Sequence, residues 1–199
     1  MDISLNLNAT IQCLDGVAGR VVGVVLHPNG NFVTQLIMRR SWLDMEERLV
    51  ALRHVKQVTY QHVYLTLTKA QLGVQPARYS TTPFPLSSLL PESLPWLDDL
   101  PALGDSMVFT RHSAVKRGMQ TVENGTAVYA LDGYIGRISA YKIDSHTYEI
   151  VNVAVDSGAL WWRQCIQLSP DMITCYRADG AQLRTTKRKL RMRAKLKIA

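Results

Sequence analysis

The sequence predicts an all-β protein made of two small β-barrels in tandem, joined by a proline-rich extended linker and followed by a basic tail. Three observations support this prediction: a motif recurs 117 residues apart, short Val-rich runs alternate with turn residues around each copy, and prolines gather between the copies. The chain has 199 residues, which suits two units of roughly 100 residues each. With 47% hydrophobic and 20% charged residues, its composition excludes wholesale disorder.

The repeated motif is Leu-Asp-Gly-x-x-Gly-Arg, which occurs at Leu14–Arg20 and again at Leu131–Arg137. Five of the seven positions are identical, and the same offset continues beyond the motif without a gap. It matches apolar positions in one register: Val21 with Ile138, Leu26 with Ile143, Val33 with Ile150, Leu36 with Val153 and Met38 with Val155. Apolar positions that match at one constant offset, beyond the motif itself, indicate two copies of one fold unit.

The first copy divides into short strands because β-branched runs alternate with Gly, Asn, Asp and Pro. Asp15-Gly16 and Pro28-Asn29-Gly30 have the composition of turns. Thr68–Leu72 has the composition of a short capped helical turn. The expected strands, in order, are Arg20–Leu26, Phe32–Arg39, Leu49–Leu52, Val58–Tyr60 and Val63–Leu67. Strands this short favour a small closed barrel.

The second copy repeats this scheme. Gly133–Ile143 is expected to pair with Tyr148–Asp156, and Gln164–Leu168 and Met172–Arg177 follow. The two units are therefore placed at residues 1–75 and 107–183, with the tail at 184–199. Six of the eight prolines fall in Pro76–Pro101, and proline cannot donate to a sheet ladder or a helix interior. Residues 76–106 are accordingly expected to form an extended linker that packs on its own barrels or on another protein.

The motif with its Val-rich hairpin, followed by Arg48–Leu52 and Val63–Leu67, resembles the PRC-barrel family. The second copy resembles it through Leu131–Arg137 and Leu160–Arg163, so that the resemblance covers residues 8–72 and 124–183. This family occurs in the cytoplasmic domain of the photosynthetic reaction centre H subunit and at the C-terminus of a ribosome maturation factor. The resemblance implies PRC-type barrels. We expect this chain to lack both the membrane helix of the H subunit and the other domain of the maturation factor.

Catalysis requires convergent titratable groups, which the sequence does not show. The five histidines are scattered, and no metal-binding, nucleophile-elbow or phosphate-loop motif is present. We therefore expect no enzyme activity, no catalytic residues, no metal and no cofactor. The three cysteines form no Cys-x-x-Cys pair and are expected to be reduced, buried thiols of a cytoplasmic protein.

The repeated motif has a structural interpretation as a turn. Its aspartates accept backbone hydrogen bonds, its glycines supply unusual dihedral angles, and its arginines pair with the turn aspartates. The residues of this turn signature are Asp15, Gly16, Gly19, Arg20, Asp132, Gly133, Gly136 and Arg137. An anion clamp formed by the two arginines is the less favoured alternative.

The formal net charge of +7 is concentrated in the tail, because the rest of the chain is nearly neutral. From Lys189 to Ile198 cationic and apolar residues alternate with period two, which suits a strand better than a helix. The cations expected to contact a partner or anion are Arg184, Lys187, Arg188, Lys189, Arg191, Arg193, Lys195 and Lys197. A solvated tail with accidental alternation remains the alternative. Trp96, Trp161 and Trp162 are candidate contact aromatics, or else pack in the barrels.

The remaining features are those of a binding protein. We expect a non-enzymatic scaffold or assembly subunit that docks on the cytoplasmic face of a membrane protein complex. By resemblance, the most specific complex is a photosynthetic reaction centre. The tail would contact anionic lipid headgroups, which makes the protein cytoplasmic or peripheral on the inner face of the membrane. The alternative is an RNA-linked assembly factor that binds a ribosomal protein and rRNA. Neither function involves a small-molecule substrate, and no membrane-spanning apolar run is present.

Overall fold

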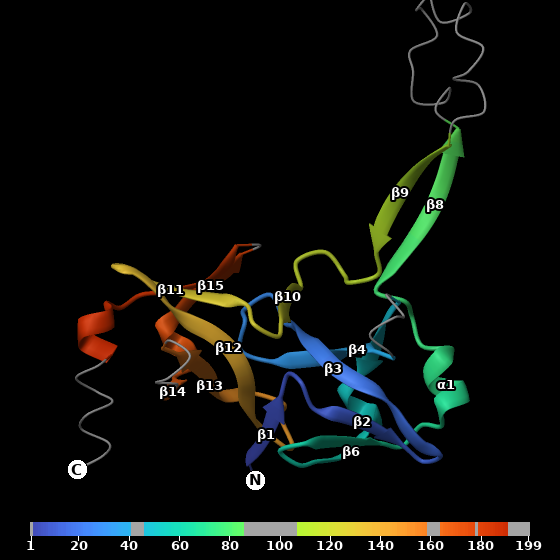
Figure 1. Cartoon of the computed structure of the whole chain (residues 1–199), viewed down its shortest axis with the longest axis horizontal. Helices are drawn as coiled ribbons and strands as arrows, with labels where there is room; N and C mark the ends of the chain where they lie inside the picture. The colour runs from blue at the N-terminus through green and yellow to red at the C-terminus, as the bar shows by residue number, and fades with distance from the viewer. Residues whose placement is uncertain (1, 41–45, 86–106, 159–163, 178, 191–199) are drawn as a thin grey trace, which may run out of the picture.

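Two β-sheets of seven strands each make up the body of the molecule (Figure 1). The computed structural model describes residues 2–40, 46–85, 107–158, 164–177 and 179–190. The all-β class expected from the sequence is confirmed. Within the described residues, each sheet is an open path of hydrogen-bonded strands, so that the two closed barrels are not confirmed.

The first sheet has the strand order β5-β4-β3-β2-β7-β6, with β10 paired to β3. Its longest strand, β3 (Gly16–Leu26), is rich in valine and forms a hairpin with β4 (Val33–Arg39) around the predicted Pro28–Gly30 turn. The other strands are β2 (Thr10–Cys13), β5 (Glu47–Ala51), β6 (Val55–Val58), β7 (His62–Leu65) and β10 (Gln120–Glu123).

A short helix closes the first sheet, as the sequence predicted. Helix α1 (Lys69–Gly73) begins after Thr68, whose side chain accepts a hydrogen bond from the backbone N–H of Gln71. The Gln71 side chain accepts in return from the backbone N–H of Thr68, which completes a capping box. A one-turn 3₁₀ helix, Leu52–His54, connects β5 to β6.

The second sheet repeats this order as β14-β13-β12-β11-β16-β15, with β1 paired to β12. Its strands are β11 (Ala127–Ala130), β12 (Gly133–Asp144), β13 (Ile150–Ser157), β14 (Gln164–Leu168), β15 (Ile173–Arg177), β16 (Gly180–Leu183) and β1 (Asp2–Asn6). A 3₁₀ turn, Pro170–Met172, stands where Leu52–His54 stands in the first sheet. The helical residues 187–190 follow β16 as α1 follows β7.

The two halves exchange one strand each. Strand β1 precedes the first repeat in sequence but pairs with β12 of the second, where Leu5 lies opposite Tyr141. Strand β10 precedes the second repeat but pairs with β3 of the first, where Val122 lies opposite Val24. These two pairs are related by the same 117-residue offset as the repeat itself. The division at residues 75 and 107 stays a prediction, and the strand pairing crosses it in both directions.

A second reciprocal contact joins the loops after β3 and β12. The N–H of Val33 donates to the carbonyl of Tyr148, and the N–H of Ile150 donates to the carbonyl of Asn31. Both bonds follow the repeat offset, as expected for two units related by an approximate two-fold axis. One hydrophobic core accordingly runs through both halves, from Leu5, Leu26 and Leu36 to Ile138 and Ile143.

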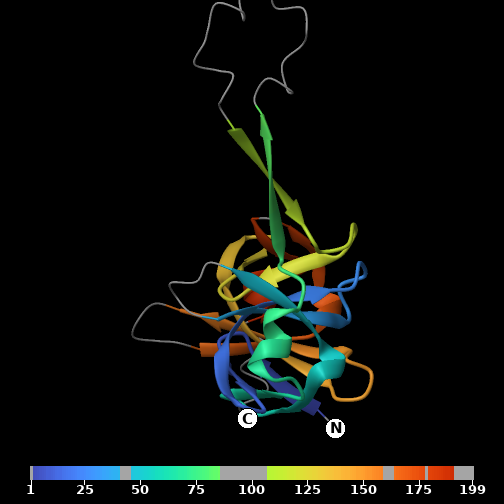
Figure 2. The same ribbon diagram turned by 90° about the vertical axis from the view of Figure 1, so that its right-hand side faces the viewer.

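A two-stranded arm projects from the body (Figures 1 and 2). It consists of β8 (Tyr79–Pro85) and β9 (Met107–Ser113), which pair with each other and with no other strand of the described chain. Residues 76–106 were expected to form an extended linker, but part of this stretch, Tyr79–Pro85, is a strand paired with β9. Residues 86–106 lie outside the described residues.

Candidate functional site: the arm, its anchor and the sheet surfaces

The turn signature has equivalent surroundings in both repeats. The Asp15 carboxylate accepts from the backbone N–H of Lys69, with N–O distances of 2.9 and 3.1 Å, and Asp132 accepts from the N–H of Lys187 at 2.8 Å. Each aspartate therefore binds the first residue of the helical turn that closes its unit. This is the backbone-accepting role that the sequence predicted for it.

The glycines of the signature have the expected special geometry. Gly16 and Gly133 have φ angles of +117° and +118°, which an L side chain rarely adopts. A Cβ at Gly19 would lie 2.3 Å from the carbonyl oxygen of Arg39, and one at Gly136 would lie 2.2 Å from that of Asp156. These two glycines allow a close approach to the neighbouring strand.

The ion pairs expected for Arg20 and Arg137 are not formed. Both arginines are exposed, and within the described residues neither pairs with its turn aspartate. The physical reason is that each arginine follows its turn aspartate by five residues along an extended strand, β3 or β12, which separates the two side chains along the strand.

The structure describes only the first half of the basic tail. Arg184, Arg188 and Lys189 are exposed, Lys187 is half-buried, and residues 187–190 are helical. Only Lys189 and Leu190 of the alternating stretch Lys189–Ile198 are described, so a strand over the rest of it stays a prediction. Leu190 is buried in the core, which fixes this turn to the body. The remaining tail cations, Arg191, Arg193, Lys195 and Lys197, lie outside the described residues, as do Trp96, Trp161 and Trp162.

The cysteines match the prediction in part. All three are free thiols, but only Cys13 is buried, whereas Cys165 is exposed and Cys175 half-buried. In the described ranges, no group of three or more His, Cys, Asp or Glu side chains is placed to hold a metal ion. No helix of the described chain is long and apolar enough to cross a membrane.

A buried charge network at the root of the arm was not predicted. Arg78, which precedes β8, is 4% exposed. Its guanidinium forms ion pairs with Glu47 of β5 at 2.6 Å and with Glu123 of β10 at 2.7 Å. Arg39 of β4 adds a second ion pair to Glu47 at 2.5 Å. The network thus links three strands of the first sheet to the arm.

Hydrogen bonds explain why these charges are tolerated in a buried position. Burial disfavours the ionised form of Glu47, but the hydrogen bonds from Arg39 and Arg78 outweigh it and lower the pKa of that carboxyl. Burial likewise opposes the charged form of Arg78, but its bonds to Glu47 and Glu123 raise its pKa above the ordinary value. Backbone bonds add to the anchor, because the Arg78 N–H donates to the Glu47 carbonyl and the Ala114 N–H donates to the Arg78 carbonyl.

The arm itself is exposed and combines apolar with cationic groups. Phe109 is 66% exposed, Met107 57% and Phe84 38%. The Arg111 guanidinium lies 3.6 Å from the centroid of the Tyr79 ring, and that of Arg78 lies 4.9 Å from it. Tyr79 therefore connects the buried network to the exposed arm through cation–π contacts. Sequence reasoning missed this surface because the prolines of β8 indicated a linker. The available signal was that Pro83 and Pro85 are two residues apart, a spacing that an edge strand accepts.

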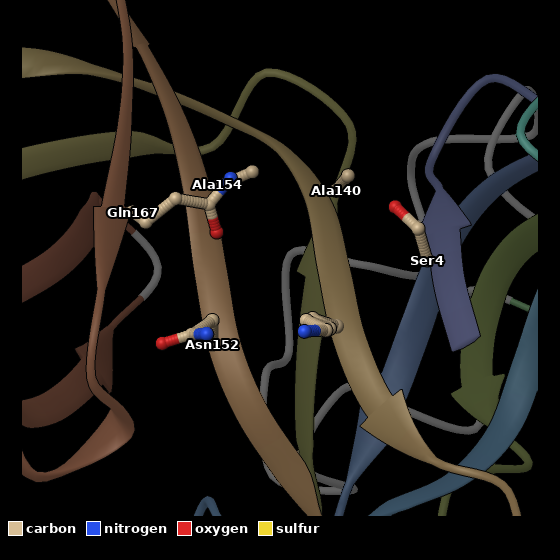
Figure 3. Close-up of a pocket in the computed structure, with 6 residues that line it drawn as sticks. Ser4, Ala140, Asn152, Ala154 and Gln167 are labelled. Carbon is tan, nitrogen blue, oxygen red and sulfur yellow. The ribbon is translucent and has the colours of Figure 1, made fainter. Parts of the chain in front are cut away.

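The outer faces of the two sheets differ. On the first sheet Val25, Ile37 and Leu49 form a small apolar cluster covered by Val115 and Met119. The positions equivalent to Val25 and Ile37 on the second sheet are Lys142 and Ala154, which line an open hollow of about 250 Å³ (Figure 3). Ser4, Ala140, Asn152 and Gln167 complete its lining, and Lys142 pairs with Asp2 at 2.8 Å. The hollow is polar, and Lys142, the one cation among the described residues that line it, is already paired.

No family model matches the chain, and no curated protein matches it significantly. The PRC-barrel resemblance therefore stays a prediction.

Proposed function

We propose that the protein is a non-enzymatic scaffold that docks on a larger protein complex and uses the β8–β9 arm as its docking element. The observation that carries this proposal is the combination of an exposed, partly apolar arm with a buried anchor. Phe109 and Met107 are exposed in a molecule whose other large apolar side chains are mostly packed in one core. Exposed apolar side chains next to arginine and tyrosine are typical of protein interfaces.

The anchor supports a docking role because it fixes the arm before any partner binds. Arg78 makes two ion pairs and two backbone hydrogen bonds at the point where the chain leaves the body. A binding element that is already ordered loses less conformational entropy on association. The network therefore stabilises the fold and also holds the arm in one position on the body.

The more specific form of the proposal comes from the family resemblance. We propose PRC-type units that dock on the cytoplasmic face of a membrane protein complex, a photosynthetic reaction centre being the most specific candidate. The identical strand order of the two sheets supports the duplicated unit on which this form depends. The exposed cations Arg184, Arg188 and Lys189 at the start of the tail support a contact with anionic lipid headgroups.

An RNA-linked assembly factor is the second candidate, because the same tail cations could bind phosphates of rRNA. The arm favours the first candidate. Its exposed side chains are mainly apolar or hydroxyl groups, whereas RNA binding proteins usually present cations across a folded face.

The test is a photo-crosslinking experiment with the full chain in its own cells. A photoreactive amino acid replaces Phe109 on the arm or, as a control, Val74, which is 83% exposed after helix α1. We expect the chain to sediment with membranes in a stoichiometric complex, and position 109 to crosslink to a protein subunit of it while position 74 does not. Sedimentation with ribosomal subunits, together with crosslinks to rRNA, would overturn the proposal. Removal of residues 191–199, which include four cations, is expected to weaken membrane retention at low salt and to make it less dependent on salt.

A further inference from the structure

The hydrogen-bond pattern of the arm can be worked out from one bond at its root. The N–H of Ala114 donates to the carbonyl of Arg78, and the register pairs Tyr79 with Ser113 next along the ladder. Antiparallel pairs alternate between hydrogen-bonded and non-hydrogen-bonded positions. Tyr79, Thr81, Pro83 and Pro85 therefore direct their backbone polar groups away from β9, and their partners on β9 direct theirs away from β8.

The two outer edges of the arm consequently differ. On β8, Pro83 and Pro85 stand at outward positions and have no N–H to donate, so that edge is a poor template for another strand. On β9, outward N–H and C=O groups belong to Met107, Phe109, Arg111 and Ser113. No strand of the described chain pairs with this edge. The β9 edge is therefore the open side of the arm.

The side chains at the outward positions of β9 lie on one face of the arm. Arg111 shares this face with Tyr79, as its position over the Tyr79 ring shows. Met107 and Phe109 precede it at intervals of two and are mostly exposed. A strand added here would place alternate side chains beside two apolar groups and one cation.

Charge gives the chemistry of the occupant. Residues 76–85 and 107–119 contain no acidic residue but include Arg111, His112, Lys116 and Arg117. Arg78 is neutralised by Glu47 and Glu123, whereas the exposed Arg111 contacts an aromatic ring and pairs with no carboxylate of the described residues. An acidic side chain on an added strand would meet Arg111 directly.

We infer that the β9 edge binds an extended segment of a partner protein by strand addition, and that this segment alternates apolar residues with an acidic residue placed opposite Arg111. The backbone of the partner segment forms hydrogen bonds with the outward N–H and C=O groups of β9. Met107 and Phe109 select apolar side chains, and Arg111 selects the carboxylate. This inference rests on the proposed scaffold function and specifies how its arm engages a partner.

The experiment uses the full chain and a fluorescein-labelled probe peptide of sequence Thr-Glu-Thr-Ile-Thr-Ile-Thr, with binding followed by fluorescence anisotropy. The key variant is Phe109→Pro, because position 109 faces outward and a proline there removes one outward N–H without breaking the β8 ladder. We expect it to weaken probe binding about tenfold or more, since a hydrogen bond is lost and the ring obstructs the edge. Phe109→Ala, which keeps the N–H, is expected to lose only part of that affinity.

Thr81→Pro is the matched control, since Thr81 occupies an outward position on the opposite edge. We expect it to bind the probe as the unaltered chain does. A probe with lysine in place of glutamate is expected to bind at least about fivefold more weakly. Thermal unfolding of each variant verifies that it folds.

Three results would overturn the inference. The first is an equal loss of probe affinity in Phe109→Pro and Thr81→Pro, and the second is equal affinity for the glutamate and lysine probes. The third is self-association of the chain that Phe109→Pro abolishes. The last result would assign the edge to a second copy. If crosslinking at position 109 still captures a subunit of a stoichiometric complex, the scaffold function stands although strand addition has failed. If the β9 edge does not bind the probe and position 109 does not crosslink to a subunit, both proposals fail.

Discussion

The carboxylate of Glu47 lies 2.6 Å from the guanidinium of Arg78, although 31 residues separate them in the sequence. Glu47 begins β5, an outer strand of the first sheet, and Arg78 is the last residue before the arm. Both side chains are less than 10% exposed. The contact therefore determines where the arm leaves the body, and its loss should affect both stability and the order of the arm.

Replacement of Glu47 by Gln is expected to destabilise the fold by about 3–5 kcal/mol, because it leaves the Arg78 guanidinium buried with only Glu123 as an ionic partner. Urea unfolding measures the loss. Relative to the unaltered chain, amide hydrogen exchange of the variant should rise more in β8 and β9 than in β12. Glu149→Gln changes an exposed carboxylate and serves as the control, with an expected effect below about 0.5 kcal/mol. An unchanged arm in Glu47→Gln would show that the network does not anchor it.

The same carboxylate predicts a dependence of stability on pH. The pKa of Glu47 is lower in the folded chain than its ordinary value, so its contribution is fully present above the ordinary pKa. It is lost as the pH falls through the lowered pKa. Unfolding free energies measured between about pH 7 and pH 3 should therefore decrease less steeply in Glu47→Gln than in the unaltered chain. Parallel pH curves for the two proteins would contradict this assignment.

The strand exchange predicts an effect that crosses from one repeat to the other. Leu5 is fully buried in β1 and lies opposite Tyr141 of the second sheet. Leu5→Ala should cost about 2–5 kcal/mol, and hydrogen exchange should rise first in β12. Val122→Ala is the reciprocal variant, because Val122 is fully buried in β10 opposite Val24. It should raise exchange first in β3. Effects confined to the sequence neighbours of each mutated residue would contradict the exchange.

Local features of the sequence were sufficient to predict many elements. The Val-rich run before Pro28–Gly30 predicted the β3–β4 hairpin, and Thr68–Leu72 predicted the short capped turn of α1, because turns and caps depend on neighbouring residues. The shared motif predicted equivalent surroundings for Asp15 and Asp132, and the hydrogen bonds to Lys69 and Lys187 confirm them.

Long-range pairing could not be derived in the same way. Nothing near Leu5 or Val122 shows that each strand joins the other repeat, since an apolar strand residue is compatible with several partners. The pairing of Arg78 with Glu47 and Glu123 depends on where three separate strands meet. Proline is rare in strands, so Pro83 and Pro85 predict a linker, and only the strand register with the Ala114–Arg78 hydrogen bond places Pro83 at an outward position on β8.

The close approach at Gly136 predicts a severe effect of a single methyl group. A Cβ there would lie 2.2 Å from the backbone oxygen of Asp156 on β13, which cannot move without disturbing the β12–β13 pairing. Gly136→Ala should therefore destabilise the fold by roughly 3 kcal/mol or more. Gly73→Ala at the end of α1 is the control, because no atom lies within 4 Å of its Cβ position. Thermal unfolding of the two variants compares them, and a similar Tm for both would contradict the predicted clash.

Two tyrosines with buried hydroxyls, the fully buried Tyr141 and the half-buried Tyr176, predict the behaviour at alkaline pH. Burial raises the pKa of Tyr176 to about 12, and it raises that of Tyr141 well above the ordinary value. The two hydroxyls interact with each other rather than with any third group of the described residues. The folded chain therefore keeps the Tyr176 proton while the unfolded chain releases it above about pH 10. Stability contributed by this group is fully present below that pH and is lost as the pH rises toward 12.

Tyr176→Phe removes this alkaline loss. From about pH 8 to pH 11, the unfolding free energy of the unaltered chain should fall by about 1.4 kcal/mol more than that of the variant. Urea unfolding at both pH values measures the difference. Tyr60→Phe is the control, since the Tyr60 ring is 69% exposed, and it should follow the unaltered chain at both pH values. If the unfolding free energies of Tyr176→Phe and the unaltered chain fall equally, the Tyr176 hydroxyl reaches solvent and is not buried as the structure shows.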